Sequence, residues 1–122
     1  SYTTFEYSGL EIATPADGDA AAVVTATVTN SGERAGAEIV QLYLGDVEAS
    51  VERPATELRG FTKVFLQPGE SRRVEIPLGV RDLSFWDVEN GGWKAEPGAF
   101  EVMLGASVAD IRLRDRFTYR PR

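Results

Sequence analysis

The sequence predicts an all-β domain, an antiparallel, immunoglobulin-like β-sandwich with seven to eight strands. Apolar and polar residues alternate with a period of two along most of the chain, and no long stretch shows the 3.6-residue period of an amphipathic helix. Turn signals made of Gly, Asn, Asp and Pro separate these stretches at short, fairly regular intervals, which is typical of sandwiches. The 122 residues, 43% of them hydrophobic, suffice for one packed core, so we expect a single domain over residues 1–122.

The first strands follow from alternation bounded by turn residues. Residues 3–7 alternate and predict the first strand, and residues 16–19 predict a turn. A second strand is expected over residues 23–29, with Val24, Ala26 and Val28 on one face, and Asn30-Ser31-Gly32 ends it.

The third strand, at about residues 38–45, is apolar on both faces. One face carries Val40, Leu42 and Leu44, and the other carries Ile39, Gln41 and Tyr43. A strand with two partly apolar faces is central in its sheet or covered on its second side, and we expect this of residues 38–45.

The second half of the chain supplies the remaining strands. Residues 58–66 predict a strand in which Gly60 marks a bulge or a close approach of two backbones. Pro68 and Gly69 occupy the two central positions of a predicted type II turn. Three further alternating stretches predict the last strands, and their apolar members are Val74, Ile76 and Leu78, then Phe100, Val102 and Leu104, then Ile111, Leu113 and Phe117.

Asn90-Gly91 is the strongest hairpin signal in the chain. A two-residue turn there pairs Val88 with Trp93 and Asp87 with Lys94. Trp86 then lies diagonally across from Trp93 on the same face, within reach of its ring. The sequence therefore predicts that the two indoles belong to one aromatic cluster.

Composition excludes several classes of function. The net charge of −6 argues against nucleic acid as a partner, since a phosphate-binding face needs clustered Lys and Arg. The chain has no Cys, so it has no thiolate nucleophile and no Cys-type zinc site, and it has no His, the commonest general base and metal ligand. The longest apolar run, Ala20 to Val24, is far too short to span a membrane. We expect a soluble domain with no membrane partner, and these observations leave its compartment undecided.

Several segments, in order and with ordinary spacing from Tyr2 to about Tyr119, carry a family resemblance. They are Ser1-Tyr2-Thr3-Thr4-Phe5, Val28-Thr29-Asn30-Ser31-Gly32, Gly36-Ala37-Glu38-Ile39-Val40-Gln41-Leu42-Tyr43-Leu44, Arg53-Pro54, Glu57-Leu58-Arg59-Gly60-Phe61, Leu66-Gln67-Pro68-Gly69-Glu70-Ser71, Trp86-Asp87 and Glu96-Pro97-Gly98-Ala99-Phe100-Glu101-Val102. The set resembles the C-terminal fibronectin type III-like domain of family 3 glycoside hydrolases, the β-glucosidase and β-xylosidase group.

The resemblance implies a parent enzyme of the retaining type, with a catalytic barrel and an α/β sandwich domain ahead of this one. In that family a barrel aspartate is the nucleophile and the acid/base residue usually lies on the second domain, and neither region is present here. We therefore expect no catalytic residue, cofactor or metal in this chain. The chain begins at Ser1 without Met and enters strand-like sequence at once, so we expect it to be a piece of a larger enzyme.

Two sets of residues are candidates for binding. Ile39, Gln41 and Tyr43, with Arg53 and Pro54 of the polar loop beside them, are the expected docking surface for the parent's other domains, because a free-standing sandwich prefers polar residues on an outer face. In the isolated chain this face is expected to be exposed or to form a weak homodimer. The alternative is that Trp86 and Trp93 stack on sugar rings, as exposed aromatics do in carbohydrate-binding modules.

Other polar clusters are better explained as surface features. Asp87 and Glu89 could mimic a glycosidase carboxyl pair, and Asp17-Gly18-Asp19 could offer oxygen ligands to calcium, but these residue types are also the usual turn formers. The alternating Arg112, Arg114 and Arg116 predict a solvated basic stripe that guards a strand edge.

We expect a non-catalytic accessory domain that packs against the catalytic barrel and the α/β sandwich domain of its own chain. A polysaccharide-targeting module and a general protein-interaction module are the alternatives. Exposure of Trp86, Trp93 and Tyr43 is the observation that separates the accessory domain from the polysaccharide-targeting module.

Overall fold

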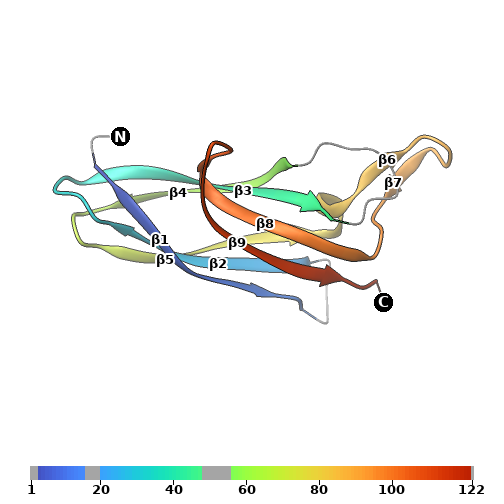
Figure 1. The fold of residues 1–122 in the computed structure, drawn as a ribbon, viewed down its shortest axis with the longest axis horizontal. Helices are drawn as coiled ribbons and strands as arrows, with labels where there is room; N and C mark the ends of the chain where they lie inside the picture. The colour runs from blue at the N-terminus through green and yellow to red at the C-terminus, as the bar shows by residue number, and fades with distance from the viewer. Residues whose placement is uncertain (1–2, 16–19, 48–55, 122) are drawn as a thin grey trace.

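The computed structural model describes residues 3–15, 20–47 and 56–121, and in these ranges it is an antiparallel β-sandwich of two sheets (Figure 1). One sheet has three strands in the order β1-β2-β5, and the other has four in the order β4-β3-β8-β9. Their bounds are β1 Phe5–Ala13, β2 Ala20–Asn30, β3 Gly36–Asp46, β4 Glu57–Leu66, β5 Ser71–Gly79, β8 Gly98–Ser107 and β9 Asp110–Tyr119. The all-β prediction is confirmed.

A two-stranded hairpin, β6 (Phe85–Asp87) with β7 (Gly92–Lys94), projects beyond one end of the sandwich (Figure 1). A single 3-10 turn, η1 (Val80–Leu83), links β5 to it. These two short strands raise the total in the described residues to nine, above the seven to eight expected, while the sandwich itself has seven.

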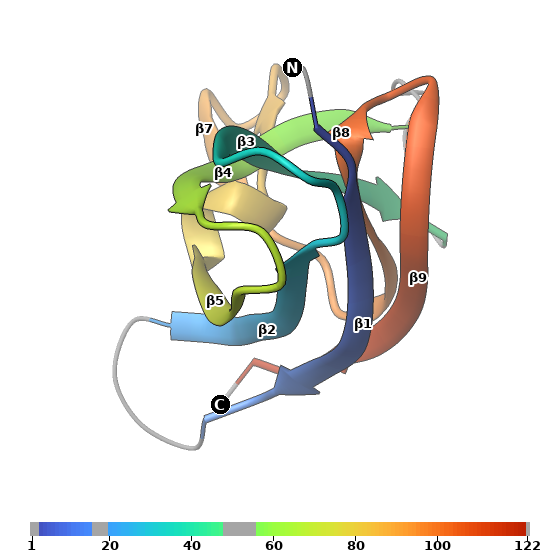
Figure 2. The same ribbon diagram turned by 90° about the vertical axis from the view of Figure 1, so that its left-hand side faces the viewer.

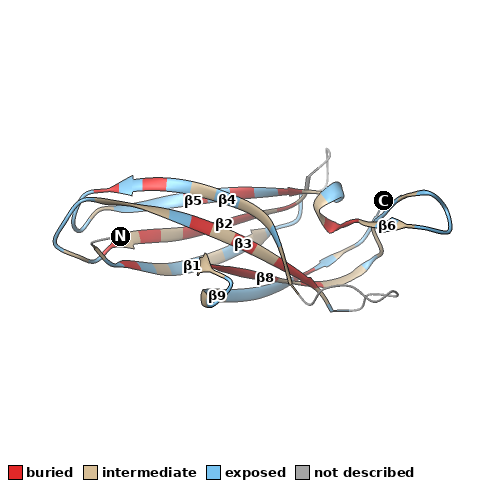
Figure 3. Ribbon diagram, turned by 90° about the horizontal axis from the view of Figure 1, so that it is seen from above, coloured by how far each residue is buried: buried red, intermediate tan, exposed pale blue. Residues whose placement is uncertain are grey.

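Strict alternation builds the core. Buried residues recur at every second position along β2, β3 and β5, which gives the red bands on these strands in Figure 3. All the inward residues predicted for β2, β3, β5 and β8 are buried, and Phe100 of β8 stacks on Phe117 of β9 with ring centroids 5.7 Å apart. β3 lies between β4 and β8, so the prediction that this strand is central is confirmed.

The first strand extends from Phe5 to Ala13, well past the predicted residues 3–7. Ser8-Gly9 interrupts the alternation because the register shifts between Ser8 and Glu11, and Gly9 has φ +63°, a conformation that favours glycine.

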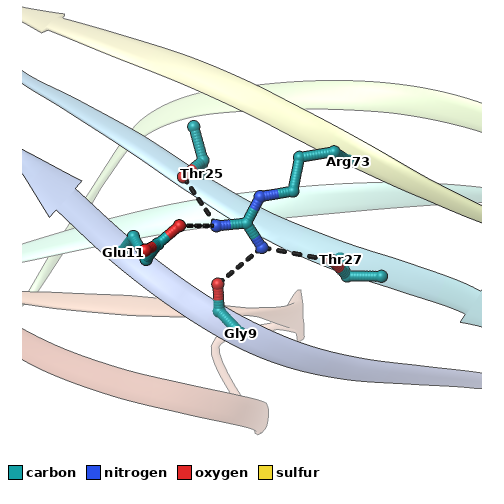
Figure 4. Close-up of polar contacts among 5 residues, drawn as sticks. All are labelled: Gly9, Glu11, Thr25, Thr27 and Arg73. Carbon is teal, nitrogen blue, oxygen red and sulfur yellow. Dashed lines mark hydrogen bonds and ion pairs between the residues drawn. The ribbon is translucent and has the colours of Figure 1, made fainter.

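The guanidinium of Arg73 on β5 spans this irregularity (Figure 4). It donates to the carbonyl oxygen of Gly9 at 2.6 Å and to the hydroxyls of Thr25 and Thr27, and it pairs with the carboxylate of Glu11. One side chain therefore ties all three strands of its sheet together across the outer face.

The expected arginine stripe on β9 is interrupted. A register shift between Leu104 and Gly105 of β8 displaces the alternation of β9, and Arg112 reaches β1, which lies beside β9 (Figure 2). Its guanidinium donates to the carbonyl oxygen of Phe5 at 2.8 Å and lies 5.4 Å from the ring centroid of Tyr7. Arg112 therefore connects the two sheets at one side of the sandwich, while Arg112, Arg114 and Arg116 all remain exposed.

Two predicted glycine roles are confirmed. Glu70 donates from its backbone nitrogen to Gln67, and Gly69 has φ +79°, as a type II turn requires. Gly60 lies next to a register shift in β4, and a methyl group there would come within 2.7 Å of Ile76 on β5. The predicted turn at residues 16–19 lies outside the described residues.

The hairpin register differs from the prediction by two positions. Trp86 pairs directly with Trp93, and Asp87 pairs with Gly92, so the loop has four residues instead of two. The carboxylate of Asp87 closes this loop by accepting hydrogen bonds from the backbone of Glu89 and from the backbone and side chain of Asn90. This side-chain-closed turn replaces the two-residue turn that Asn-Gly favours, and the expected pairing of Asp87 with Lys94 is wrong.

Candidate functional site

The outer face of the four-stranded sheet carries a contiguous apolar patch. Ile39 on β3 pairs with Lys63 on β4, so Phe61 and Phe65 are its two diagonal neighbours on the same face. Ile39 is 46% exposed, Phe61 68% and Phe65 55%, although all three are large apolar side chains. We call Ile39, Phe61 and Phe65 the apolar sheet face.

The patch continues along both strands toward the hairpin end of the domain. Tyr43 pairs with Leu58, which is also exposed, and the Tyr43 hydroxyl donates to the side-chain oxygen of Gln41. Both Gln41 and Tyr43 are half-buried by their neighbours on the sheet. On the next strand, Met103 pairs with Tyr43 and is buried without belonging to the central core cluster, so this part of the outer face is already covered by side chains.

Ile39, Gln41 and Tyr43 therefore lie together on an outer face, as the alternation of β3 predicts. Arg53 and Pro54, the other two predicted docking residues, lie outside the described residues. Sequence reasoning missed Phe61 and Phe65, which are more exposed than Ile39. The signal was present, because Phe61 and Phe65 alternate with Lys63 on one face while Val64 and Leu66 fill the other.

The outer face of the three-stranded sheet, on the other side of the sandwich, is polar. There, Thr25, Thr27 and Thr29 of β2 pair with Glu75, Arg73 and Ser71 of β5, respectively. This polar face suits water, whereas the apolar sheet face does not. The two sides of the sandwich are therefore not equivalent as surfaces.

The second candidate site lies at the end of the domain where the hairpin projects. Trp86 and Trp93 face each other across β6 and β7 with ring centroids 5.7 Å apart and planes at 84°, a T-shaped pair. Trp86 is 53% exposed and Trp93 is 51% exposed. The guanidinium carbon of Arg81 lies 4.1 Å from the ring centroid of Trp93. The prediction of one aromatic cluster is confirmed, and its members lie on the surface.

A hollow of about 290 Å³ opens beside Trp93. Its lining is Arg59, Arg81, Asp82, Ser84 and Trp93. The Nε of Arg59 donates to the carbonyl oxygen of Asp82 at 2.9 Å, and its Nη2 pairs with the carboxylate of Glu57 at 2.8 Å. These contacts fix the Arg59 guanidinium at the wall of the hollow.

Of the acidic residues considered from the sequence, Asp17 and Asp19 lie outside the described residues, and Asp87 and Glu89 belong to the hairpin. Asp87 is engaged in its turn, and the hydrogen bond from the side-chain amide of Asn90 holds the pKa of the Asp87 carboxyl below its usual value. Within the described ranges no three acidic residues gather closely enough to hold a metal ion. The same ranges contain no helix long and apolar enough to cross a membrane.

Comparison with known proteins identifies the family. The profile of the fibronectin type III-like domain matches residues 38–108, the segment from β3 through most of the β8–β9 connection. The chain belongs to this family. The resemblance to the domain of this kind in family 3 glycoside hydrolases is confirmed by the relatives that follow.

This fibronectin type III-like domain is 40% identical to part of a probable β-glucosidase L from Aspergillus fumigatus, covering 98% of this chain and 18% of that protein. It is 45% identical to part of β-glucosidase BoGH3A from Bacteroides ovatus, covering 98% and 16%. The crystal structure of a GH3 β-glucosidase from Bifidobacterium adolescentis superposes with a TM-score of 0.90 at 39% identity, covering 97% and 17%. The chain thus spans less than one fifth of the length of these proteins.

Proposed function

We propose that this domain is a non-catalytic accessory unit of a β-glucosidase-like family 3 glycoside hydrolase and that it docks onto the other domains of that chain. The supporting observation is the apolar sheet face. Two phenylalanines and an isoleucine, each about half exposed or more, are contiguous on one side of a sandwich whose other side is polar.

Size and position favour docking by this face. From typical aromatic and aliphatic side-chain areas, the exposed parts of Ile39, Phe61 and Phe65 sum to roughly 300 Å². That is within the range of the largest patch on an ordinary monomer, and such patches are often functional. The exposed Leu58 extends the patch along β4, and the half-buried Tyr43 and Gln41 supply a polar margin.

The related proteins support a partner within the same chain. They are β-glucosidases of which this chain matches less than one fifth, so a matching region in each is accompanied by several hundred further residues. The catalytic barrel and the α/β sandwich domain implied by the resemblance are the proposed partners. Ile39, Gln41 and Tyr43, together with Phe61 and Phe65, form the proposed contact.

A module that lies flat on polysaccharide is less well supported. Such a surface needs exposed aromatic rings in one plane, whereas the planes of Trp86 and Trp93 are at 84°. The two half-exposed indoles therefore offer no common flat surface to a row of sugar rings.

The test compares Phe61→Ser and Phe65→Ser with Val108→Ser, a change of another exposed apolar residue located at the β8–β9 turn. In the full-length enzyme the two phenylalanine variants should lower the melting temperature by several degrees, while the control leaves it unchanged. In the isolated chain all three variants should unfold within about 0.5 kcal/mol of the parent, because surface side chains contribute little to folding. Equal melting temperatures for all full-length variants would refute the docking role.

The absence of catalysis is tested separately. The isolated chain should release the phenol from aryl β-glucosides or β-xylosides no faster than the uncatalysed reaction does. Turnover that disappears in Asp87→Asn or Glu89→Gln would show instead that this chain has a catalytic carboxylate.

A further inference from the structure

The hollow beside Trp93 combines features that the docking proposal does not use. An indole ring that is half exposed forms one wall, and the guanidiniums of Arg59 and Arg81 line the others. Asp82 and Ser84 add oxygen atoms. Apolar ring surface and polar groups thus meet in one concave site, as in small-molecule sites generally.

The polar groups have capacity left for a ligand. Arg81 makes a cation–π contact with Trp93, and among the described residues it has no ion pair. Asp82 uses its Oδ2 to accept from the backbone nitrogen of Gly79 at 2.8 Å, and no residue that the structure describes donates to its other carboxylate oxygen. The Ser84 hydroxyl donates to the carbonyl oxygen of Val80 at 2.8 Å and can still accept. The site offers both donors and acceptors.

This mixture identifies the class of ligand. An anion would be attracted by the two arginines but repelled by the carboxylate of Asp82. A purely apolar ligand would leave all of these polar groups unpaired, which is costly. A neutral ring with hydroxyls at its rim and C–H groups on its faces satisfies both kinds of wall. We propose that this hollow binds a single pyranose ring of a neutral sugar.

The shape limits the ligand to one ring. The volume of about 290 Å³ is near the lower limit of about 300 Å³ for small-molecule sites. A longer saccharide would need several aromatic rings in one plane, whereas the ring of Trp86 lies at 84° to that of Trp93. The site would therefore hold a monosaccharide or the terminal unit of a chain.

The site is separate from the apolar sheet face. Phe65 pairs with Ala37 at the start of β3, whereas the hairpin lies beyond the opposite end of the sandwich (Figure 1). Sugar binding here does not depend on docking by Ile39, Phe61 and Phe65, and each can fail without the other.

The probe is methyl β-D-glucopyranoside, titrated into the ¹⁵N-labelled chain and followed by NMR. We expect saturable shifts of the Trp93 indole N–H and of the Arg59 and Arg81 side-chain signals, with a dissociation constant on the order of 1–10 mM, as for a small polar ligand. Trp93→Ala should weaken binding at least about tenfold, because it removes the ring that forms one wall of the hollow. Phe61→Ala, an exposed aromatic outside the hollow, should leave it unchanged.

Arg81→Leu provides a second variant that keeps both tryptophans, and it should weaken binding by roughly fivefold. The backbone spectrum of each variant shows whether it remains folded. Sodium acetate and cyclohexanol serve as the anionic and apolar probes. The proposal is overturned if no shift saturates, if Trp93→Ala or Arg81→Leu binds like the parent, or if acetate or cyclohexanol binds better than the glucoside.

Discussion

The side-chain amide of Asn30 donates a hydrogen bond to the carbonyl oxygen of Leu66, 3.0 Å away, and so joins the end of β2 in one sheet to the end of β4 in the other. The same amide donates to the carbonyl oxygen of Arg34 at 2.7 Å, and its oxygen accepts from the Thr3 hydroxyl and the backbone of Gly32. Asn30 is fully buried and its side chain is fully paired. It holds three chain segments at one end of the sandwich.

Asn30→Ala should therefore reduce the free energy of unfolding by about 3 kcal/mol, because several buried backbone groups lose their partners at once. Urea denaturation measures the change. Ser31→Ala, at the next and exposed position, should cost less than about 0.5 kcal/mol. A cost below about 1 kcal/mol for Asn30→Ala would show that water replaces the amide without penalty.

Gly105→Ala should be more damaging than an ordinary glycine change. A methyl group at Gly105 would come within 2.0 Å of the carbonyl oxygen of Asp110, and backbone atoms of a paired strand cannot move aside cheaply. We expect a loss of about 3 kcal/mol or more, at the upper end of overpacking. At Gly92 the corresponding space is empty and φ is not positive, so Gly92→Ala is the matched control and should be close to neutral. Similar melting temperatures for the two variants would contradict the register of β8 and β9.

Trp86→Ala tests whether the tryptophan pair contributes to folding. Because both indoles are about half exposed, we expect the loss to be about 0.5–1.5 kcal/mol, the value of an aromatic pair. Phe100→Ala removes a fully buried ring and should cost about 3–5 kcal/mol. Thermal denaturation of both variants gives the comparison, and equal costs would mean that the hairpin is part of the core.

The alkaline stability of the domain should depend on Tyr7. Burial raises the pKa of the Tyr7 phenol above its ordinary value of about 10. The Glu38 carboxylate, which accepts a hydrogen bond from the phenol at 3.1 Å, raises this pKa further. The folded chain therefore keeps a proton that the unfolded chain loses. The resulting stability is complete below about pH 10 and is lost as the pH rises above it.

Tyr7→Phe should show a shallower loss of stability above about pH 10 than the parent chain. Below about pH 9 the difference between the two chains should be constant, since the phenol is protonated in both states. Urea denaturation at several pH values measures both parts. An identical alkaline dependence would show that Tyr7 ionises equally in the folded and unfolded chains.

The sequence was sufficient for the features that depend on alternation alone. The inward faces of β2, β3, β5 and β8, and the central place of β3, follow from burying every second side chain. The two predictions that failed, the extent of the first strand and the hairpin register, depend on single polar groups at irregular positions. The extent of β1 depends on Gly9 and the Arg73 guanidinium that spans it, and the hairpin register depends on the Asp87 carboxylate. Such contacts leave no periodic pattern of apolar and polar residues in the sequence.

The candidate surfaces were predicted in part. The alternation of β3 placed Ile39 and Tyr43 outside the core, but attention to a single strand missed Phe61 and Phe65 on its neighbour. Pairing register brings these residues together, and register across a long loop cannot be counted from the sequence. The hollow beside Trp93 was also missed, since Arg59 reaches it from β4 and Arg81 from η1.

The placement of both tryptophans in the β6–β7 hairpin determines what optical measurements on this protein report. The chain has only two tryptophans, and both are about half exposed and outside the central core cluster. Intrinsic fluorescence will therefore follow melting of the hairpin and quenching by Arg81, and it can change while the sandwich remains intact. Near-ultraviolet dichroism from the perpendicular indole pair will be equally local. Far-ultraviolet dichroism, which the strands of both sheets produce, is the signal that follows global unfolding.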